Sequence, residues 1–162
     1  MMAETAVFVT MLFTDIEGST RLWEAYPGEM QGALARHDRL VRDSIEGAGG
    51  RVVKSAGDGF CAAFESAPAA VRAAVGMQRA VAEEPWPAET PIRIRVAVHS
   101  AACEARAGDY FGPAVNRVAR LLSIVHGGQI LVSGATEAIA RDAMPASTEF
   151  LDMGEHRLKD LQ

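Results

Sequence analysis

The sequence has little of several features that mark particular protein classes. Its two cysteines, Cys61 and Cys103, lie in no C-x-x-C or Cys/His motif, which excludes a disulfide framework and a cysteine-based zinc or redox site. A net charge of -5 leaves no concentrated basic surface, so we expect no nucleic acid partner. No stretch approaches the ~18 apolar residues of a membrane span, and the amino terminus has no basic segment followed by a long apolar one. We therefore expect a cytoplasmic protein without a membrane partner.

The sequence does have the composition of a globular domain. Of its 162 residues, 49% are apolar and 23% are charged, which is enough apolar surface for a sizeable core. No internal repeat or low-complexity linker divides the chain. We expect one domain over residues 1–162.

Hydrophobic periodicity predicts strands that alternate with helices. The predicted strands are 6–13, 51–55, 60–64, 92–99, 129–133 and a weaker 148–153, with a turn over 108–112. The predicted helices run from a cap at Ser19 or Thr20 to 45 with a break at Pro27, and then over 67–83, 114–125 and 135–144. Interleaved helices and strands with one tight hairpin predict an α/β (α+β) fold, whose mixed sheet has a ferredoxin-like core, rather than a doubly wound parallel sheet.

Two aspartates follow apolar strands at glycine turns. Asp15 lies in the segment FTDIEGST, and Asp58 lies in VVKSAGDGF, at the tip of the predicted hairpin. A strand end fixes the backbone while the carboxylate reaches solvent, and paired carboxylates suit Mg²⁺ on nucleotide phosphates. The motif therefore indicates phosphate chemistry.

The turn after Asp15 has a second possible role. Backbone N–H groups at a helix start attract phosphate oxygens, so Gly18, Ser19 and Thr20 could bind a triphosphate. A plain helix cap explains the same residues equally well, and the spacing of an NTPase phosphate loop is missing.

A third motif runs from Gly108 to Arg120 in the segment GDYFGPAVNRVAR. Asn116 and Arg120 are four residues apart and share one helix face. An amide and a guanidinium can hold a ribose and stabilise charge on a phosphate, although such a pair alone is often a solvated face.

These three motifs together resemble the class III nucleotidyl cyclases, the adenylate and guanylate cyclase catalytic domain, and most closely its short actinobacterial and mycobacterial members. The resemblance covers residues 8–159. It implies two divalent cations, Mg²⁺ or Mn²⁺, held by Asp15, Asp58 and the Ile16 carbonyl. It also implies that Gly18, Ser19 and Thr20 bind the phosphates.

The resemblance assigns the remaining residues as well. Lys54 and Asp109 match the pair that reads the base, while Asn116 and Arg120 match residues that orient the ribose and stabilise the transition state. Lys159 resembles a late lysine that contacts the triphosphate. One departure is that Ala97, Ala101 and Ala102 stand where the family usually has a glycine-containing strand and turn.

The base-reading pair favours ATP. Adenine presents an N1 acceptor to the Lys54 ammonium and an N6 donor to the Asp109 carboxylate, whereas guanine reverses this pattern. Guanylate cyclases of the family typically have Glu and a small residue at these two positions.

The resemblance further implies a head-to-tail homodimer with two shared sites, in which ATP becomes cyclic AMP and pyrophosphate. Three alternatives remain at this point. The protein could be a guanylate cyclase, a catalytically weak nucleotide-binding module of the same fold, or a plain dimerisation domain.

Overall fold

The structure is a computed structural model that describes residues 5–154. Its centre is one mixed sheet, formed by β1 (Thr5–Ile16), β2 (Arg51–Ala56), β3 (Gly59–Phe64), β4 (Ile94–Arg106), β5 (Asp109–Phe111) and β6 (Ile130–Val132). The strand order is β2-β3-β1-β4-β5, and every neighbouring pair along it is antiparallel. β6 pairs with β4 in parallel. The predicted mixed sheet with a ferredoxin-like βαββαβ core is confirmed.

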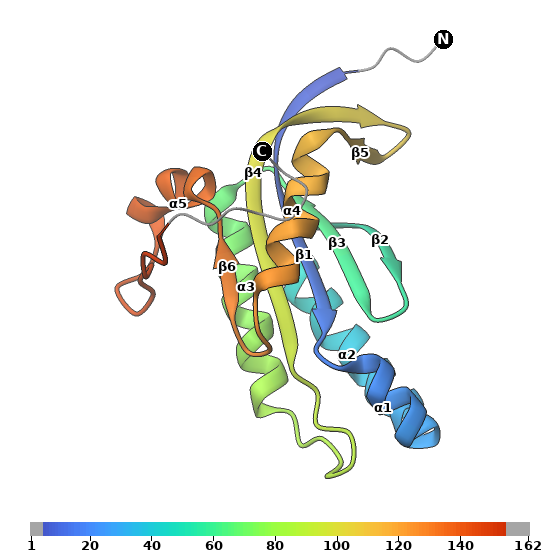
Figure 1. The fold of residues 1–162 in the computed structure, drawn as a ribbon. Helices are drawn as coiled ribbons and strands as arrows, with labels where there is room; N and C mark the ends of the chain where they lie inside the picture. The colour runs from blue at the N-terminus through green and yellow to red at the C-terminus, as the bar shows by residue number, and fades with distance from the viewer. Residues whose placement is uncertain (1–4, 155–162) are drawn as a thin grey trace.

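Helices cover both faces of this sheet. They are α1 (Ser19–Ala25), α2 (Pro27–Gly47), α3 (Ala67–Glu83), α4 (Pro113–Ile124) and α5 (Gly134–Ala140), which continues into a 3-10 turn over Arg141–Ala143. Figure 1 shows α2 and α3 on one face and α4 on the other, where it crosses β1 and β4. No helix in residues 5–154 combines the length and apolar character needed to cross a membrane.

Side chains alternate between two apolar layers because successive residues of a strand point to opposite faces. On β1, Leu12 is fully buried against α2 and α3, while Met11 packs in the layer beneath α4. The alanines of α3 let that helix lie close to the sheet, with Ala70 and Ala74 fully buried. These layers hold the end of β1 and the β2–β3 hairpin in place, and these two segments carry the two aspartate motifs.

Several predicted elements are confirmed. The helix predicted over 67–83 is α3, and the expected break at Pro27 separates α1 from α2. The β2–β3 hairpin turns on Gly57 and Asp58, with Gly57 at φ +58, as in hairpin turns that place glycine at the first central position.

Two predictions on β4 and β5 need correction. The strand predicted over 92–99 begins at Ile94 and continues to Arg106, because β1 pairs with it along its whole length. Ala97 is fully buried within this strand, which runs unbroken through Ala101 and Ala102. The turn predicted over 108–112 is narrower, since Ala107 and Gly108 turn the chain and β5 follows at once.

Two further predictions are wrong. Neither Ser19 nor Thr20 caps the first helix, because Gly18 is the N-cap at φ +68 and Ser19 is already helical. The strand predicted over 148–153 does not form. Instead Phe150 packs against the small apolar cluster between α3 and α5.

Candidate active site

Asp15 and Asp58 come together at one end of the sheet. Asp15 is the penultimate residue of β1, and Asp58 lies in the turn between β2 and β3. The Ile16 N–H donates a hydrogen bond of 2.9 Å to Asp58 Oδ2, so the hairpin tip is tied to the end of β1. Both carboxylates are half-buried.

The donor chemistry of this pair fits a hard divalent cation. Carboxylate and carbonyl oxygens are the ligands that Mg²⁺ and Mn²⁺ prefer. Asp15, Asp58 and the Ile16 carbonyl could supply such oxygens, with waters or substrate phosphates completing the set. Among residues 5–154 no cluster of three or more His, Cys, Asp or Glu side chains offers an all-protein metal cage.

Arg95 is a member of this group that the sequence analysis missed. It faces Asp15 directly across the β1–β4 ladder. Its Nε donates to Asp15 Oδ1 at 2.6 Å, and its Nη2 donates to Asp15 Oδ2. In the sequence, Arg93 and Arg95 alternate with apolar residues, a pattern that indicates only a strand with one polar face. Nothing in one strand's pattern shows which residue of the next strand lies opposite.

The turn after Asp15 is exposed at its start. Gly18 and Thr20 are exposed and Ser19 is half-exposed, and neither hydroxyl caps α1. The first N–H groups of a helix have no partner within the helix. These groups remain the predicted phosphate-binding element.

Lys54 and Asp109 form a second group. Lys54 Nζ donates to Asp109 Oδ2 at 3.2 Å, which joins β2 to the start of β5. The pair borders a shallow, open and largely apolar depression, whose other lining residues include Met11, Phe13, Val53, Cys61, Tyr110 and Val115. An apolar wall with a few converging polar groups is typical of a site for a flat organic ring.

A β-bulge sets the direction of Lys54. The ladder pairs Val52 with Ala62 and then Lys54 with Cys61, so Val53 is the extra residue. Strict alternation would place Arg51 and Lys54, three apart, on opposite faces of the sheet. The bulge brings both to the α4 face, where Asp109 lies.

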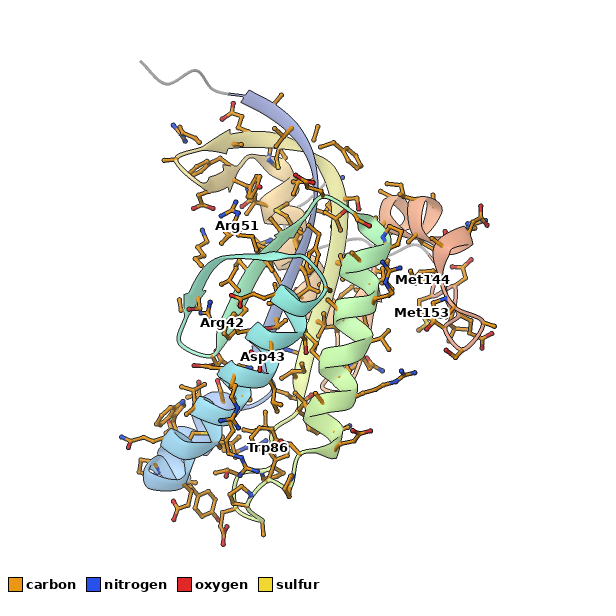
Figure 2. The ribbon with its side chains drawn as sticks, turned by 180° about the vertical axis from the view of Figure 1, so that it is seen from behind. Arg42, Asp43, Arg51, Trp86, Met144 and Met153 are labelled. Atoms are coloured by element: carbon orange, nitrogen blue, oxygen red, sulfur yellow. The ribbon has the colours of Figure 1, made fainter. Side chains whose placement is uncertain are left out.

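Arg51 supports Asp109 from the side. Its Nη1 donates to the Gly108 carbonyl at 3.1 Å, and its Nη2 donates to the Tyr110 hydroxyl at 3.2 Å. Figure 2 shows Arg51 at the start of β2, beside the β4–β5 hairpin. The sequence analysis assigned no role to Arg51 or Tyr110, because both contacts join distant segments.

The environment keeps Asp109 ionised. Burial alone would raise the pKa of Asp109, but the Tyr110 N–H bond, the hydrogen bond and charge of Lys54, and the Arg51 charge together hold the pKa below its ordinary value. The carboxylate is therefore a hydrogen-bond acceptor at neutral pH.

Asn116 and Arg120 lie on α4 as predicted, with Asn116 exposed and Arg120 half-buried. The described contacts bring neither of them to the aspartate pair or to the Lys54–Asp109 pair. Lys159 lies outside the described residues.

The two groups stand apart on one chain. Figure 1 shows the β4–β5 hairpin at one end of the sheet and the β2–β3 turn with the end of β1 towards the other. Asp15 and Asp58 thus share one location, and Lys54 and Asp109 another.

Comparisons with known proteins agree with these motifs. The profile of the family described as "Adenylate and Guanylate cyclase catalytic domain" matches residues 1–160. An uncharacterized protein of Mycobacterium tuberculosis is 37% identical over 155 residues, covering 94% of this chain and 52% of the relative. An adenylate cyclase of Schizosaccharomyces pombe is 29% identical over 181 residues, covering 95% of this chain and 11% of the enzyme. The chain thus spans about half of the first relative and a small part of the second.

Solved structures are similar along nearly the whole chain. An adenylate/guanylate cyclase/hydrolase from Silicibacter pomeroyi superposes with a TM-score of 0.87 at 32% identity, covering 99% of this chain and 94% of that one. An adenylate cyclase from Trypanosoma brucei, determined in its monomeric state, gives a TM-score of 0.86 at 27% identity, covering 96% of this chain and 85% of that one.

Proposed function

The chain belongs to the adenylate and guanylate cyclase catalytic domain family, and from this premise we propose that it converts ATP to 3′,5′-cyclic AMP and pyrophosphate. The proposal takes the described residues as part of one catalytic domain over 1–162.

The Lys54–Asp109 pair is the observation that carries the choice of ATP. An ammonium and an ionised carboxylate 3.2 Å apart present one donor and one acceptor beside an apolar depression. Adenine offers the matching N1 acceptor and N6 donor, whereas guanine offers O6 and N1–H in the reversed order. A pair arranged for one pattern disfavours the other, because each polar group would then meet a group of the same hydrogen-bonding kind.

Asp15, Asp58 and the Ile16 carbonyl are the proposed ligands of two divalent cations, Mg²⁺ or Mn²⁺. Such cations, when bound, would lower the pKa of the ribose 3′-hydroxyl and neutralise phosphate charge. The hydrogen bond from Ile16 N–H to Asp58 keeps the second carboxylate at the end of β1. The turn of Gly18, Ser19 and Thr20 would donate backbone N–H groups to the triphosphate, with Lys159 as a further contact.

In the proposed reaction the ribose 3′-oxygen bonds to the α-phosphorus, and the bond from that phosphorus to the β-phosphate oxygen breaks. Pyrophosphate leaves, and the hydroxyl proton passes to solvent. Asn116 would orient the ribose, and Arg120 would balance the charge that grows on the α-phosphate.

A head-to-tail homodimer is the proposed assembly. Asp15 and Asp58 lie at one place on the chain and Lys54 and Asp109 at another, while Asn116 is exposed on α4. A two-fold axis would bring the first group of one protomer to the second group of its partner, and would do so twice.

The direct test is cyclic nucleotide formation by the purified protein with Mn²⁺ and either ATP or GTP, resolved by chromatography. We expect cyclic AMP from ATP. Asp58→Asn should lower turnover on the order of 100-fold or more, because it weakens the proposed cation site. Asp43→Asn is the matched control, since Asp43 is an exposed aspartate on α2 (Figure 2).

The shared sites have a test of their own. A mixture of Asp15→Asn and Asn116→Ala protomers should regain activity, because one site of each heterodimer is intact. A mixture no more active than either variant would contradict the shared site. ATP binding without any cyclic product would favour a nucleotide-binding module, and cyclic GMP as the main product would favour a guanylate cyclase.

A further inference from the structure

The proposed metal ligand Asp15 already has a cationic partner in the fold. The Arg95 guanidinium engages both oxygens of the Asp15 carboxylate, with Nε to Oδ1 at 2.6 Å and Nη2 to Oδ2. The two residues are directly opposite in the β1–β4 ladder, so the backbone holds them in this register. A forked, charge-assisted pair of this kind is stronger than an ordinary surface ion pair.

The pair is also partly buried. The exposed fraction is 28% for the Arg95 side chain and 21% for that of Asp15. Asp58 and Glu17 add further negative charge around the guanidinium. An arginine remains protonated in proteins, so Asp15 can be freed only if the side chain moves.

Asp58 differs from Asp15 in this respect. Its Oδ2 accepts the Ile16 N–H, and among residues 5–154 no hydrogen bond reaches its Oδ1. One of the two carboxylates therefore keeps an open oxygen, while the other is engaged at both. A divalent cation that approaches the Asp15 carboxylate is repelled by the Arg95 guanidinium, which is already bonded to both carboxylate oxygens.

We propose that Arg95 is the built-in counter-cation of the metal site, which holds Asp15 in the metal-free protein and competes with the divalent cation for its carboxylate. Arg95 then acts as a positioning residue that lowers the affinity of the site for metal. The inference rests on the proposed function, because it takes Asp15 as a metal ligand.

The test measures Mn²⁺ binding to the full chain in the absence of nucleotide, by electron paramagnetic resonance of free Mn²⁺. Arg95→Gln should raise the affinity about tenfold, since the lost pair is a charged hydrogen bond. The same variant should unfold at a lower temperature without Mn²⁺ and gain more from added Mn²⁺ than the wild type does. Arg95→Lys keeps the positive charge but cannot donate two parallel hydrogen bonds to the carboxylate, so its Mn²⁺ affinity should lie between those of the wild type and Arg95→Gln.

Arg93→Gln is the matched control. Arg93 lies two residues before Arg95 on the same segment, its side chain is exposed, and the substitution removes the same charge. It should leave Mn²⁺ affinity near that of the wild type. An equal gain in Arg93→Gln, or an unchanged or weaker affinity in Arg95→Gln, would overturn the inference. If Arg95→Gln does not fold, the Mn²⁺ affinity of Arg95→Lys serves as the test. An affinity of Arg95→Lys no higher than that of the wild type would then overturn the inference. The metal site itself fails in a different way, namely if Asp15→Asn binds Mn²⁺ as tightly as the wild type.

Discussion

Lys54 Nζ lies 3.2 Å from Asp109 Oδ2, although the two residues belong to strands at opposite edges of the path β2-β3-β1-β4-β5. The contact forms because the bulge at Val53 turns Lys54 to the α4 face and the two-residue turn at Ala107 and Gly108 folds β5 back. A donor and an acceptor therefore stand side by side before any ligand arrives.

This pair leads to the first prediction, which concerns base choice. Replacing Lys54→Glu together with Asp109→Gly should put an acceptor in place of the donor at position 54 and remove the acceptor at position 109, which moves preference from ATP towards GTP. We expect the ratio of kcat/KM for ATP over GTP to fall on the order of 100-fold, as the loss of two hydrogen bonds to charged groups implies. Steady-state kinetics with both nucleotides provide the measurement. An unchanged ratio would remove both residues from base reading.

The second prediction concerns Arg51, which donates to the Gly108 carbonyl on one side of Asp109 and to the Tyr110 hydroxyl on the other. Arg51→Gln should raise KM for ATP about three- to tenfold and leave kcat close to that of the wild type. The substitution removes hydrogen bonds that hold the segment around Asp109, and the expected loss of binding free energy is about that of one hydrogen bond. The split between KM and kcat distinguishes this role from a general loss of stability.

Arg42 provides the control for Arg51. Figure 2 labels Arg42 on α2, where it pairs with Glu46. Its guanidinium lies 5.6 Å from the centre of the Phe60 ring, much as that of Arg51 lies 5.7 Å from the centre of the Tyr110 ring, and Arg42 does not line the depression. Arg42→Gln should leave KM unchanged. Equal effects of the two substitutions would show that Arg51 acts only through stability.

Much of this arrangement could be predicted from the sequence. The parts that could not be predicted have a physical reason. Local patterns such as the alanine-rich period of α3 and the glycine turn around Asp58 predicted their elements, because those signals lie within a few neighbouring residues. The family motifs pointed to Lys54 and Asp109, which the fold does bring together.

Long-range register was the part that could not be predicted. Arg95 meets Asp15 across eighty positions of sequence, and the bulge at Val53 depends on how β2 pairs with β3. The same limit explains the length of β4, which is set by its partner β1, and the missing strand over 148–153, whose Phe150 packs elsewhere.

The third prediction concerns a close approach between Gly50 and Phe64. A Cβ built at Gly50 would lie 2.4 Å from the ring of Phe64, whose side chain is buried in the core. Gly50→Ala should lower the free energy of unfolding by about 1–3 kcal/mol, as overpacking does. Gly47→Ala is the control, because its Cβ position has no heavy atom of the described residues within 4 Å apart from its chain neighbours and its own helix backbone, and alanine favours the helix. Chemical denaturation would measure both, and a stability of Gly50→Ala equal to that of Gly47→Ala would contradict the clash.

The last prediction concerns pH and the buried His37. The ring is fully buried on α2, its Nδ1 bonds Asp38 Oδ1 at 2.8 Å, and its Nε2 has no hydrogen-bond partner within residues 5–154. Burial lowers the pKa of His37 despite the opposing hydrogen bond and charge of Asp38 and the charge of Asp58. The unfolded chain therefore takes up a proton near pH 6.5 that the folded chain still excludes.

Unfolding is accordingly coupled to proton uptake, so the free energy of unfolding should fall as the pH decreases below about 6.5, by at most ~1.4 kcal/mol per pH unit for this group. Burial also lowers the pKa of His99, which adds a contribution of the same sign. His37→Leu should flatten the slope between pH 6.5 and 5.5, measured by urea denaturation at each pH, whereas His126→Gln should not, because His126 is exposed. A slope that His37→Leu leaves intact would mean that the folded protein protonates His37 as readily as the unfolded chain does.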